Sequence, residues 1–298
     1  GDVTAEETRI VMGTVAHLAV RADELASQAA LRDGLAVLTA TEEDADGAVL
    51  ARVEEAAGTG AWTEVSPALY ETLSLAQEMA RQSDGAFDVP SGTLTELRDA
   101  ARAAQHPPTA EEIAAAQSRV DWHALELRER AADDGEHPEV RLLRAGMKID
   151  RGALIKGLAL DGIARSWAAG GAVNALADLG SSSILACGVN AEGEPWRIGV
   201  RNPRGESRSD LAATVQLSDA MLSASGDDER YFLYEGRRYH HLVDPRTGDP
   251  AETGLASVTV ILPQDAMTGT MWAGHEGQLS DMLSTAIFVM GAERGRSL

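Results

Sequence analysis

The stretch M-K-I-D-R-G-A-L-I-K-G-L-A-L-D, residues 147–161, brings together the features that a chain uses to bind a phosphate. An apolar run ends at Asp150, a predicted tight turn contains Gly152, and the first turn of a predicted helix contains Lys156. Backbone N–H groups, the positive end of the helix dipole and an ammonium group would then point at one small volume. The stretch therefore predicts a phosphate site, with the Asp150 carboxylate beside it for a sugar hydroxyl, a base edge or a metal.

The same stretch contains neither of the two common nucleotide-binding loops, since G-x-x-x-x-G-K-[ST] and G-x-G-x-x-G are both missing from it. A strand that ends in a glycine turn before a helix is also a common connection with no binding role. On local sequence alone, this ordinary connection stays open as the alternative.

The composition is that of a folded protein with a strongly acidic balance. The chain has 298 residues, of which 44% are apolar, and its net charge is -21. No run approaches the roughly 20 apolar residues of a membrane-spanning helix, so no transmembrane segment is predicted. Nucleic acid and anionic membranes both need a basic face, and the charge argues against them as partners. The single cysteine, Cys187, excludes an internal disulfide and is predicted to be a small buried residue.

Hydrophobic periodicity predicts an α+β protein. Residues 8–20 alternate as a strand with Gly13 as a bulge, and residues 22–38 follow a helical pattern before an acidic turn at 41–47. Strands outnumber long helices in the second half of the chain, which favours α+β over a regular alternation of strands and helices. No interdomain linker is evident, so residues 1–298 are predicted to form a single domain.

Two predicted N-cap residues indicate where two further helices begin. Ser66 precedes Pro67 and an apolar stripe, which is typical of a helix N-terminus. Thr109 precedes A-E-E-I and is predicted to cap a second helix. Between them, the segment S-D-G-A-F-D-V-P-S-G at 83–92 is a loop by composition, with an aromatic side chain next to a carboxylate.

The segment Y-H-H-L-V-D-P-R-T-G at 239–248 contains a candidate general base. If it is a strand, then Tyr239, His241 and Val243 share one face, while His240 lies on the other. His241 is thus the histidine that shares its face with Val243, and it could act as a general base. The alternative is that it is simply packed.

The segment D-x-x-x-T at 281–285 contains a candidate metal site. Residues four apart share one face of a helix, so Asp281 and Thr285 would offer a carboxylate and a hydroxyl together. Hard oxygens of this kind suit Mg²⁺, which takes few protein ligands and keeps phosphate and water for the rest. The alternative is that Asp281 or Ser280 is the helix N-cap and Thr285 is packed.

These motifs stand in a fixed order that resembles the FAD:protein FMN transferase (ApbE) family over residues 12–291. D-x-G-A-x-x-K-G and H-x-x-D-P-R-T-G are specific to it. The full order is M-G-T at 12–14, S-D-G-A-F-D at 83–88, I-D-x-G-A-x-x-K-G-x-A-x-D at 149–161, S-A-S-G-D-x-E-R-Y-F at 223–232, Y-H-H-L-V-D-P-R-T-G-x-P at 239–250, S-V-T-V-I at 257–261 and D-x-x-S-T-A-x-F-V-M-G at 281–291.

The resemblance implies a two-lobed α+β fold with mixed or antiparallel sheets, flanking helices and an active site between the lobes. It implies cleavage of the FAD pyrophosphate, transfer of FMN to a threonine or serine hydroxyl of a target flavoprotein, and release of AMP. His241 would be the base, and Mg²⁺ would be held by the Ala153 carbonyl with Asp281, Thr285 and Ser284. The expected FAD contacts are Met12, Ala86, Phe87, Asp88, Asp150, Lys156 and Val243.

The chain departs from the family pattern in three places. Residues 38–54 lack the aromatic residue and the asparagine that help to hold the flavin. The family's Gly-Gly-Asp/Asn is Gly180-Ser181-Ser182 here, and residues 263–280 contain an apparent insertion with Trp272 and His275. The insertion could cover the site, contact the target or be an inert surface loop.

Two alternatives to the transferase follow. The protein could be a Mg²⁺-dependent FAD pyrophosphatase that gives FMN and AMP, which the altered residues 38–54 make credible. It could also be a non-catalytic FAD-binding protein, although a mere binder has no need of His241. The resemblance further implies an extracytoplasmic location, periplasmic or at the cell surface, with a lipid anchor possible in a full-length precursor.

Overall fold

The computed structural model describes residues 1–298, apart from the side chains of residues 44–46. The chain forms a mixed α+β fold and divides into two compact units, each built from separate segments. The first unit contains residues 1–43, 155–225 and 257–284, and the second contains residues 44–154, 226–256 and 285–298.

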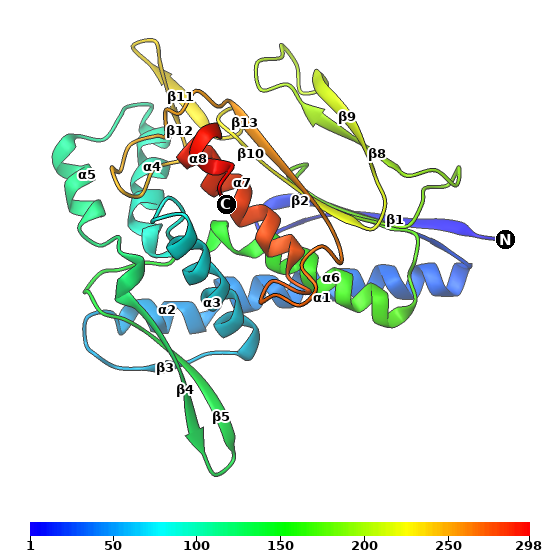
Figure 1. Ribbon diagram of the computed structural model, residues 1–298, viewed down its shortest axis with the longest axis horizontal. Helices are drawn as coiled ribbons and strands as arrows, with labels where there is room; N and C mark the ends of the chain where they lie inside the picture. The colour runs from blue at the N-terminus through cyan, green and yellow to red at the C-terminus, as the bar shows by residue number, and fades with distance from the viewer. The chain divides into compact units, whose positions relative to one another are not determined.

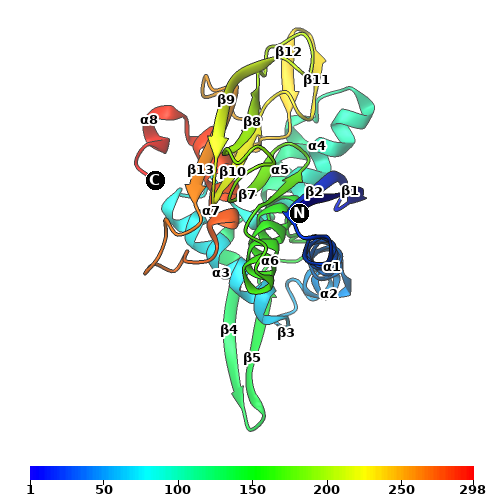
Figure 2. The same ribbon diagram turned by 90° about the vertical axis from the view of Figure 1, so that its right-hand side faces the viewer.

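A six-stranded sheet forms the centre of the first unit (Figure 1). Its strand order is β1-β2-β6-β7-β10-β13, and β7, β10 and β13 lie side by side in Figure 2. The strands are β1 (Val3–Val11), β2 (Thr14–Ala22), β6 (Ala175–Leu179), β7 (Ser183–Cys187), β10 (Ala220–Gly226) and β13 (Ser257–Pro263).

Two long helices cover one face of this sheet. Side chains of α1 (Glu24–Asp46) and α6 (Ile155–Gly170) pack with inward residues of the strands, including Leu18, Leu179 and Leu185, in one apolar core that also buries Trp167 and Cys187. The hairpin of β8 (Trp196–Arg201) and β9 (Leu211–Leu217) packs on the other face through Ile198 and Leu217. The buried position predicted for Cys187 is confirmed.

The second unit combines helices with two small antiparallel sheets, β3-β5-β4 and β11-β12. Ser66 Oγ accepts from the Leu69 N–H at 3.1 Å, and Thr109 forms a full capping box, so both predicted caps are confirmed. The elements are α2 (Ala48–Glu55), β3 (Thr63–Glu64), α3 (Pro67–Gln82), α4 (Gly92–Ala104), α5 (Ala110–Gln117), β4 (Leu125–Ala132), β5 (Gly135–Leu142), β11 (Tyr231–Tyr234), β12 (Arg237–His240) and α8 (Ala292–Gly295).

Two predictions near the N-terminus are wrong. Residues 8–20 are a hairpin and not one strand, because Met12 and Gly13 form a turn with φ values of +52° and +68°. The acidic residues 41–47 do not end the first helix, which continues to Asp46. Glutamate is a good helix former, and the segment contains no proline or glycine before Gly47. The Glu42 carboxylate accepts from the Met12 N–H at 2.9 Å, which further supports the extension.

In residues 147–161 the predicted helix is confirmed, and the predicted strand is wrong. Residues 147–150 belong to no strand of the described chain, and a short 3₁₀ helix, η3 (Arg151–Ala153), replaces the expected tight turn. Helix α6 then begins at Ile155, so Lys156 does lie in its first turn. Gly152 is not needed for a positive φ, since it is not among the glycines with that conformation.

Candidate active site

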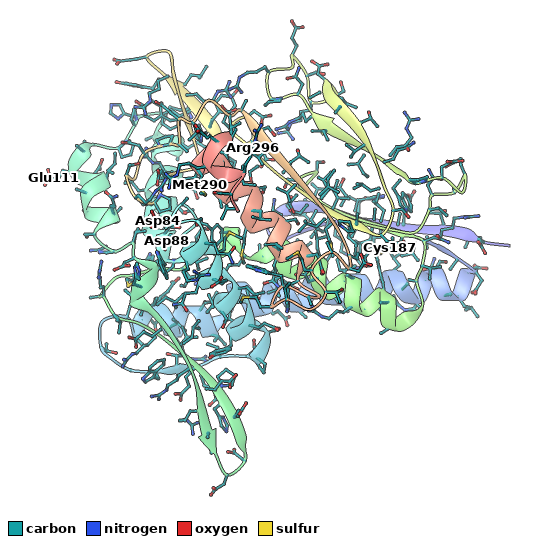
Figure 3. The ribbon with its side chains drawn as sticks, viewed as in Figure 1. Asp84, Asp88, Glu111, Cys187, Met290 and Arg296 are labelled. Carbon is teal, nitrogen blue, oxygen red and sulfur yellow. The ribbon has the colours of Figure 1, made fainter. Side chains whose placement is uncertain are left out.

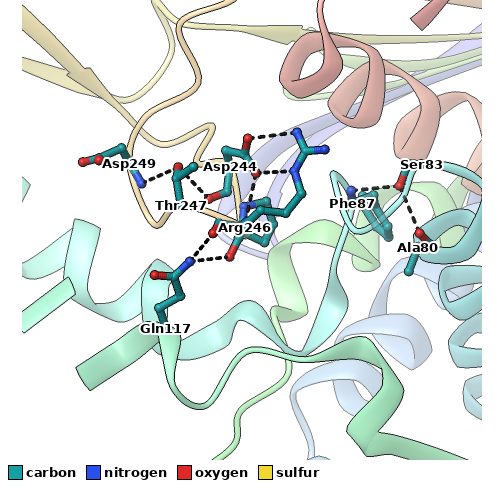
Figure 4. Close-up of polar contacts among 9 residues, drawn as sticks. Ala80, Ser83, Phe87, Gln117, Asp244, Arg246, Thr247 and Asp249 are labelled. Atoms are coloured by element: carbon teal, nitrogen blue, oxygen red, sulfur yellow. Dashed lines mark hydrogen bonds and ion pairs between the residues drawn. The ribbon is translucent and has the colours of Figure 1, made fainter. Parts of the chain in front are cut away.

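The loop after α3 in the second unit is closed by its own hydrogen bonds. Ser83 Oγ accepts from the Phe87 N–H at 3.0 Å and donates to the Ala80 carbonyl at 3.4 Å (Figure 4). Gly85 adopts φ +74°, which suits glycine, and Ala86 and Phe87 are both buried. The backbone of this predicted flavin-binding loop is therefore fixed by local contacts.

Asp88, at the end of this loop, is a buried carboxyl group with one oxygen in use (Figure 3). Its Oδ2 accepts from the Trp122 N–H at 3.1 Å, whereas Oδ1 finds no hydrogen-bond partner within the described part of the chain. Burial raises the pKa of Asp88 to about 7, and this outweighs the lowering by the Trp122 N–H. Asp88 can therefore exist as a neutral acid near neutral pH and donate a hydrogen bond.

The structure brings Asp150 against the segment that follows Asp88. The Asp150 N–H donates to the Val89 carbonyl at 2.8 Å, and Thr95 Oγ1 donates to Asp150 Oδ2 at 3.0 Å. Burial raises the pKa of Asp150, while the Thr95 hydroxyl and the charge of Arg230 act in the opposite direction. Two motifs about sixty residues apart in the sequence thus form one cluster in the second unit.

The D-P-R-T-G turn is held in place from several sides. Arg246 pairs with the Asp244 carboxylate through two contacts of 2.9 Å, and Gln117 on α5 donates to the Pro245 and Arg246 carbonyls (Figure 4). Arg98, a buried residue of α4, donates to the Gly248 carbonyl. The turn after His241 is therefore fixed to two helices of the same unit.

The strand that was predicted to contain His241 ends one residue before it. Strand β12 stops at His240, and Val243 forms only an isolated bridge with Pro250. The predicted strand is therefore shorter than expected, although the alternation of burial continues, since His241 and Val243 are half-buried and Leu242 between them is buried. The assignment of both residues to the site depends on the family resemblance. His241 is half-buried, and its backbone N–H donates to the Arg230 carbonyl at 3.0 Å.

In the first unit, Lys156 reaches the Gly-Ser-Ser turn between β6 and β7. Its Nζ donates to Ser182 Oγ, and Asp178 accepts from the Ser181 N–H at 2.7 Å. Burial raises the pKa of Asp178, and the charges of His17 and Lys156 partly offset this. The departure from the family's Gly-Gly-Asp/Asn thus gives the lysine a hydroxyl partner. Met12, also in this unit, is half-buried in the β1–β2 turn.

The candidate metal ligands of the closing helix lie within it and not at its end. Helix α7 (Glu276–Met290) begins five residues before Asp281, so the alternative that Asp281 or Ser280 is the N-cap is wrong. Asp281 and Thr285 are four residues apart and share one face of the helix. Ser284 is fully buried, and its hydroxyl pairs with Ser225 Oγ at 2.7 Å and donates to the Asp281 carbonyl at 2.9 Å.

These donors fit Mg²⁺ better than a softer metal. Residues 1–298, the side chains at 44–46 excepted, contain no group of three His, Cys, Asp or Glu side chains arranged to hold an ion. On α7, the Asp281 carboxylate and the Ser284 and Thr285 hydroxyls are hard oxygens, and so sparse a set would leave positions for phosphate and water. Ala153 belongs to η3, where its N–H donates to the Asp150 carbonyl at 3.3 Å.

Several supporting residues of the site have no signal in the local sequence. Thr95 contacts Asp150, Ser182 contacts Lys156, and Gln117 holds the D-P-R-T-G turn. Each is a polar residue whose partner lies at least 26 residues away in the sequence, so no local pattern indicates the contact. For Ser182 alone there was a signal, namely the altered Gly-Gly-Asp/Asn motif.

Comparison with solved structures defines the class of protein. The ApbE protein of Thermotoga maritima superimposes with a TM-score of 0.77 at 27% identity, over 97% of this chain and 87% of that one. The apo flavinyl transferase ApbE of Pseudomonas stutzeri gives a TM-score of 0.77 at 26% identity, over 99% and 87%. The fold is therefore the α+β fold of these ApbE structures.

Comparison of sequences then gives the family. The FAD:protein FMN transferase of Treponema pallidum is 31% identical over 97% of this chain and 79% of its own length. The enzyme of the same description from Haemophilus influenzae is 28% identical over 90% and 72%. Residues 12–298 match the ApbE family, and the chain belongs to it. None of the helices described is long and apolar enough to cross a membrane.

Proposed function

We propose that this protein is an FAD:protein FMN transferase that moves FMN from FAD to a threonine or serine hydroxyl of a target protein. The observation that supports this most directly is the family match over residues 12–298, within which His241, Lys156, Asp281 and Thr285 are all present. A protein that only bound FAD would need neither the base nor the metal ligands.

The loop cluster of the second unit is the proposed site for part of FAD. Ala86, Phe87, Asp88 and Asp150 are linked there through the Val89 carbonyl and the Thr95 hydroxyl. A neutral Asp88 can donate a hydrogen bond to a carbonyl or ring nitrogen of the ligand, and its buried Oδ1 is the atom available for this. Met12 and Val243 are further proposed contacts, on family resemblance.

The phosphate chemistry requires positive charge in a chain whose net charge is -21. Lys156 is the proposed phosphate ligand, and the Ser182 hydroxyl that it contacts keeps its ammonium group oriented. Asp281, Thr285, Ser284 and the Ala153 carbonyl are the proposed ligands of Mg²⁺. When bound, Mg²⁺ supplies charge neutralisation on the phosphate that is transferred.

His241 is the proposed general base. A neutral imidazole nitrogen accepts the proton of the target hydroxyl, and the hydroxyl oxygen forms a bond to the phosphorus of the FMN moiety. The bond between that phosphorus and the bridging oxygen breaks, and AMP leaves with the electron pair of that bond. The products are FMN in a phosphoester bond to the target, AMP and a proton held by His241.

A second candidate function shares this site. If water replaces the target hydroxyl, the same residues would hydrolyse FAD to FMN and AMP. The observation that favours it is the segment of residues 38–54, in the end of α1 and in α2, where the aromatic residue and the asparagine of the family pattern are missing. An incompletely held flavin would be transferred less selectively.

One experiment separates these functions. The protein is incubated with FAD and Mg²⁺, with and without a candidate target flavoprotein, and AMP and protein-bound flavin fluorescence are measured. AMP formed only together with a fluorescent target supports transfer, whereas AMP formed equally without a target supports hydrolysis. Retention of intact FAD in both reactions would reject both enzymatic functions.

Two further parts of the proposal depend on family resemblance alone. We expect the two-lobed arrangement of the family, with the active site between the lobes, and an extracytoplasmic location. Fractionation of cells that produce this protein, followed by its detection in each fraction, tests the location.

A further inference from the structure

Helices α6 and α7 approach each other more closely than most side chains would allow. A Cβ atom on Gly157 would lie 2.7 Å from the Gln278 Cα atom and 3.0 Å from the Gly277 carbonyl oxygen. A Cβ atom on Gly277 would lie 3.0 Å from the Gly157 carbonyl oxygen. The contact is thus backbone against backbone, and it lies one residue after Lys156.

The buried Asp161 carboxylate of α6 caps the N-terminus of α7 next to this contact. Asp161 Oδ1 accepts from the Gly277 N–H at 2.7 Å, and Oδ2 accepts from the Gln278 N–H at 3.0 Å and from Gln278 Nε2 at 3.1 Å. These are N–H groups of the first turn of α7, which have no partner within that helix. Asp161 is only 1% exposed. A helix is usually capped by the residue just before it, but α7 is capped by this side chain of α6.

The insertion before α7 adds to the same contact. His275 Nδ1 and Gln278 Nε2 are 3.2 Å apart, Trp272 is 5% exposed, and Arg165 donates to the Gly274 carbonyl at 3.3 Å. Gly157, Asp161 and Arg165 are spaced four residues apart, so one face of α6 meets the insertion and the start of α7. The end of the insertion is therefore anchored to α6.

Strand β10 fixes α7 from the side. Ser280 Oγ lies 2.9 Å from Ser223 Oγ, and Ser284 Oγ lies 2.7 Å from Ser225 Oγ. The four hydroxyl groups are buried, and their spacing of four on the helix matches a spacing of two on the strand. Because Asp161 caps its first turn and its serines pair with β10, α7 has little freedom to slide or rotate. Asp281 lies one turn after the cap.

We propose that Asp161 is a positioning residue for the metal site: by capping α7 it fixes the place of Asp281 relative to Lys156. This inference depends on the proposed function, because it takes Asp281 as a Mg²⁺ ligand. Asp161 acts through the helix, since its oxygens are occupied by Gly277 and Gln278. Removal of a supporting partner of a metal ligand typically costs 10- to 100-fold in metal affinity.

The test is the metal affinity of Asp161→Ala. Mn²⁺ is titrated into FAD-saturated protein without a target, and free Mn²⁺ is followed by electron paramagnetic resonance. We expect the half-saturating Mn²⁺ concentration to rise about tenfold, while FAD affinity in EDTA changes less than twofold. Gln278→Ala, which keeps both backbone contacts of Asp161, should give a smaller rise and is the variant to use if Asp161→Ala does not fold.

Asp23→Ala is the matched control. Asp23 Oδ1 accepts from the Ala26 N–H at 3.0 Å and caps α1, so this variant loses an aspartate cap at the start of a helix other than α7. It should leave the Mn²⁺ titration unchanged. If Asp161→Ala and Gln278→Ala also leave it unchanged, or if the wild type binds no Mn²⁺, the positioning role is overturned. A wild type that binds Mn²⁺ but forms no AMP when FAD and a target flavoprotein are both supplied would instead reject the proposed function, and the variants would still decide the role of Asp161.

Discussion

The loop cluster of the second unit and the helix contact of the first unit hold their functional residues in different ways. In the loops of the second unit, Thr95 donates a hydrogen bond to the Asp150 carboxylate, and Gln117 and Arg98 donate to backbone carbonyls of the D-P-R-T-G turn. In the helix contact, one carboxylate and two glycines decide how closely α6 and α7 approach. Loss of one hydrogen bond should therefore change activity little in the loops of the second unit, whereas one substitution at the α6–α7 contact should change it strongly.

The largest expected effect on FMN transfer is that of His241→Ala in the second unit, because this variant removes the proposed general base. His241→Ala should reduce FMN transfer by about 10²- to 10⁴-fold, because a general base contributes in this range. FAD affinity should change little. The measurement is flavin fluorescence of the target protein after gel electrophoresis, with FAD binding by titration calorimetry as the control. Transfer at the wild-type rate would remove His241 from the mechanism.

Gly157→Ala tests the helix contact directly. The new Cβ would lie 2.7 Å from a backbone atom of Gln278, so α6 and α7 must move apart. We expect a loss of about 1–3 kcal/mol in the free energy of unfolding, as for other overpacked sites. The metal concentration for half-maximal transfer should rise with it. Gly171→Ala is the comparison, because nothing lies within 4 Å of a Cβ there, although its φ of +73° adds local strain.

Asp88→Asn tests the buried acid of the loop cluster through pH. The folded-state pKa of about 7 is above the unfolded value of 3.8, so the folded state binds a proton that the unfolded state has lost. The contribution of Asp88 to stability is present at low pH and is lost as the pH rises from about 4 to 7, by at most about 1.4 kcal/mol per pH unit.

The amide in Asp88→Asn cannot titrate, so the difference in free energy of unfolding between wild type and variant should fall over this range and flatten above pH 7. Urea denaturation at pH 5, 6, 7 and 8 measures it. Asp99→Asn, at an exposed carboxylate of α4, is the control variant. A difference that does not depend on pH would show that Asp88 is ionised throughout.

The smallest expected effect is that of Gln117→Ala in the loop region. The variant loses the hydrogen bonds to the Pro245 and Arg246 carbonyls, which together cost about 0.5–1 kcal/mol because a single Gln117 Nε2 group makes both. Arg98 still holds Gly248, and Arg246 still pairs with Asp244. FMN transfer should therefore stay within about twofold of wild type. A loss as large as that of Gly157→Ala would contradict the contrast between the two regions.

Local signals predicted some elements well. Ser66 and Thr109 fixed the starts of α3 and α5, because a cap needs only a side chain and the next few N–H groups. The β1–β2 hairpin was missed, because M-G interrupts an alternation that is otherwise continuous on both sides. The end of β12 at His240 was missed for a similar reason, since the apolar pattern continues past the last ladder hydrogen bond.

The sequence by itself determined the family, the order of the motifs and the residue types available for chemistry, because these depend only on which residues follow one another. The tertiary structure decided which of them meet. Asp150 with Thr95, Lys156 with Ser182, and Asp161 with Gly277 are contacts between segments 26 to 116 residues apart. Such contacts leave no periodic signal in the chain, and they form only when packing brings buried polar groups to the partners that they require.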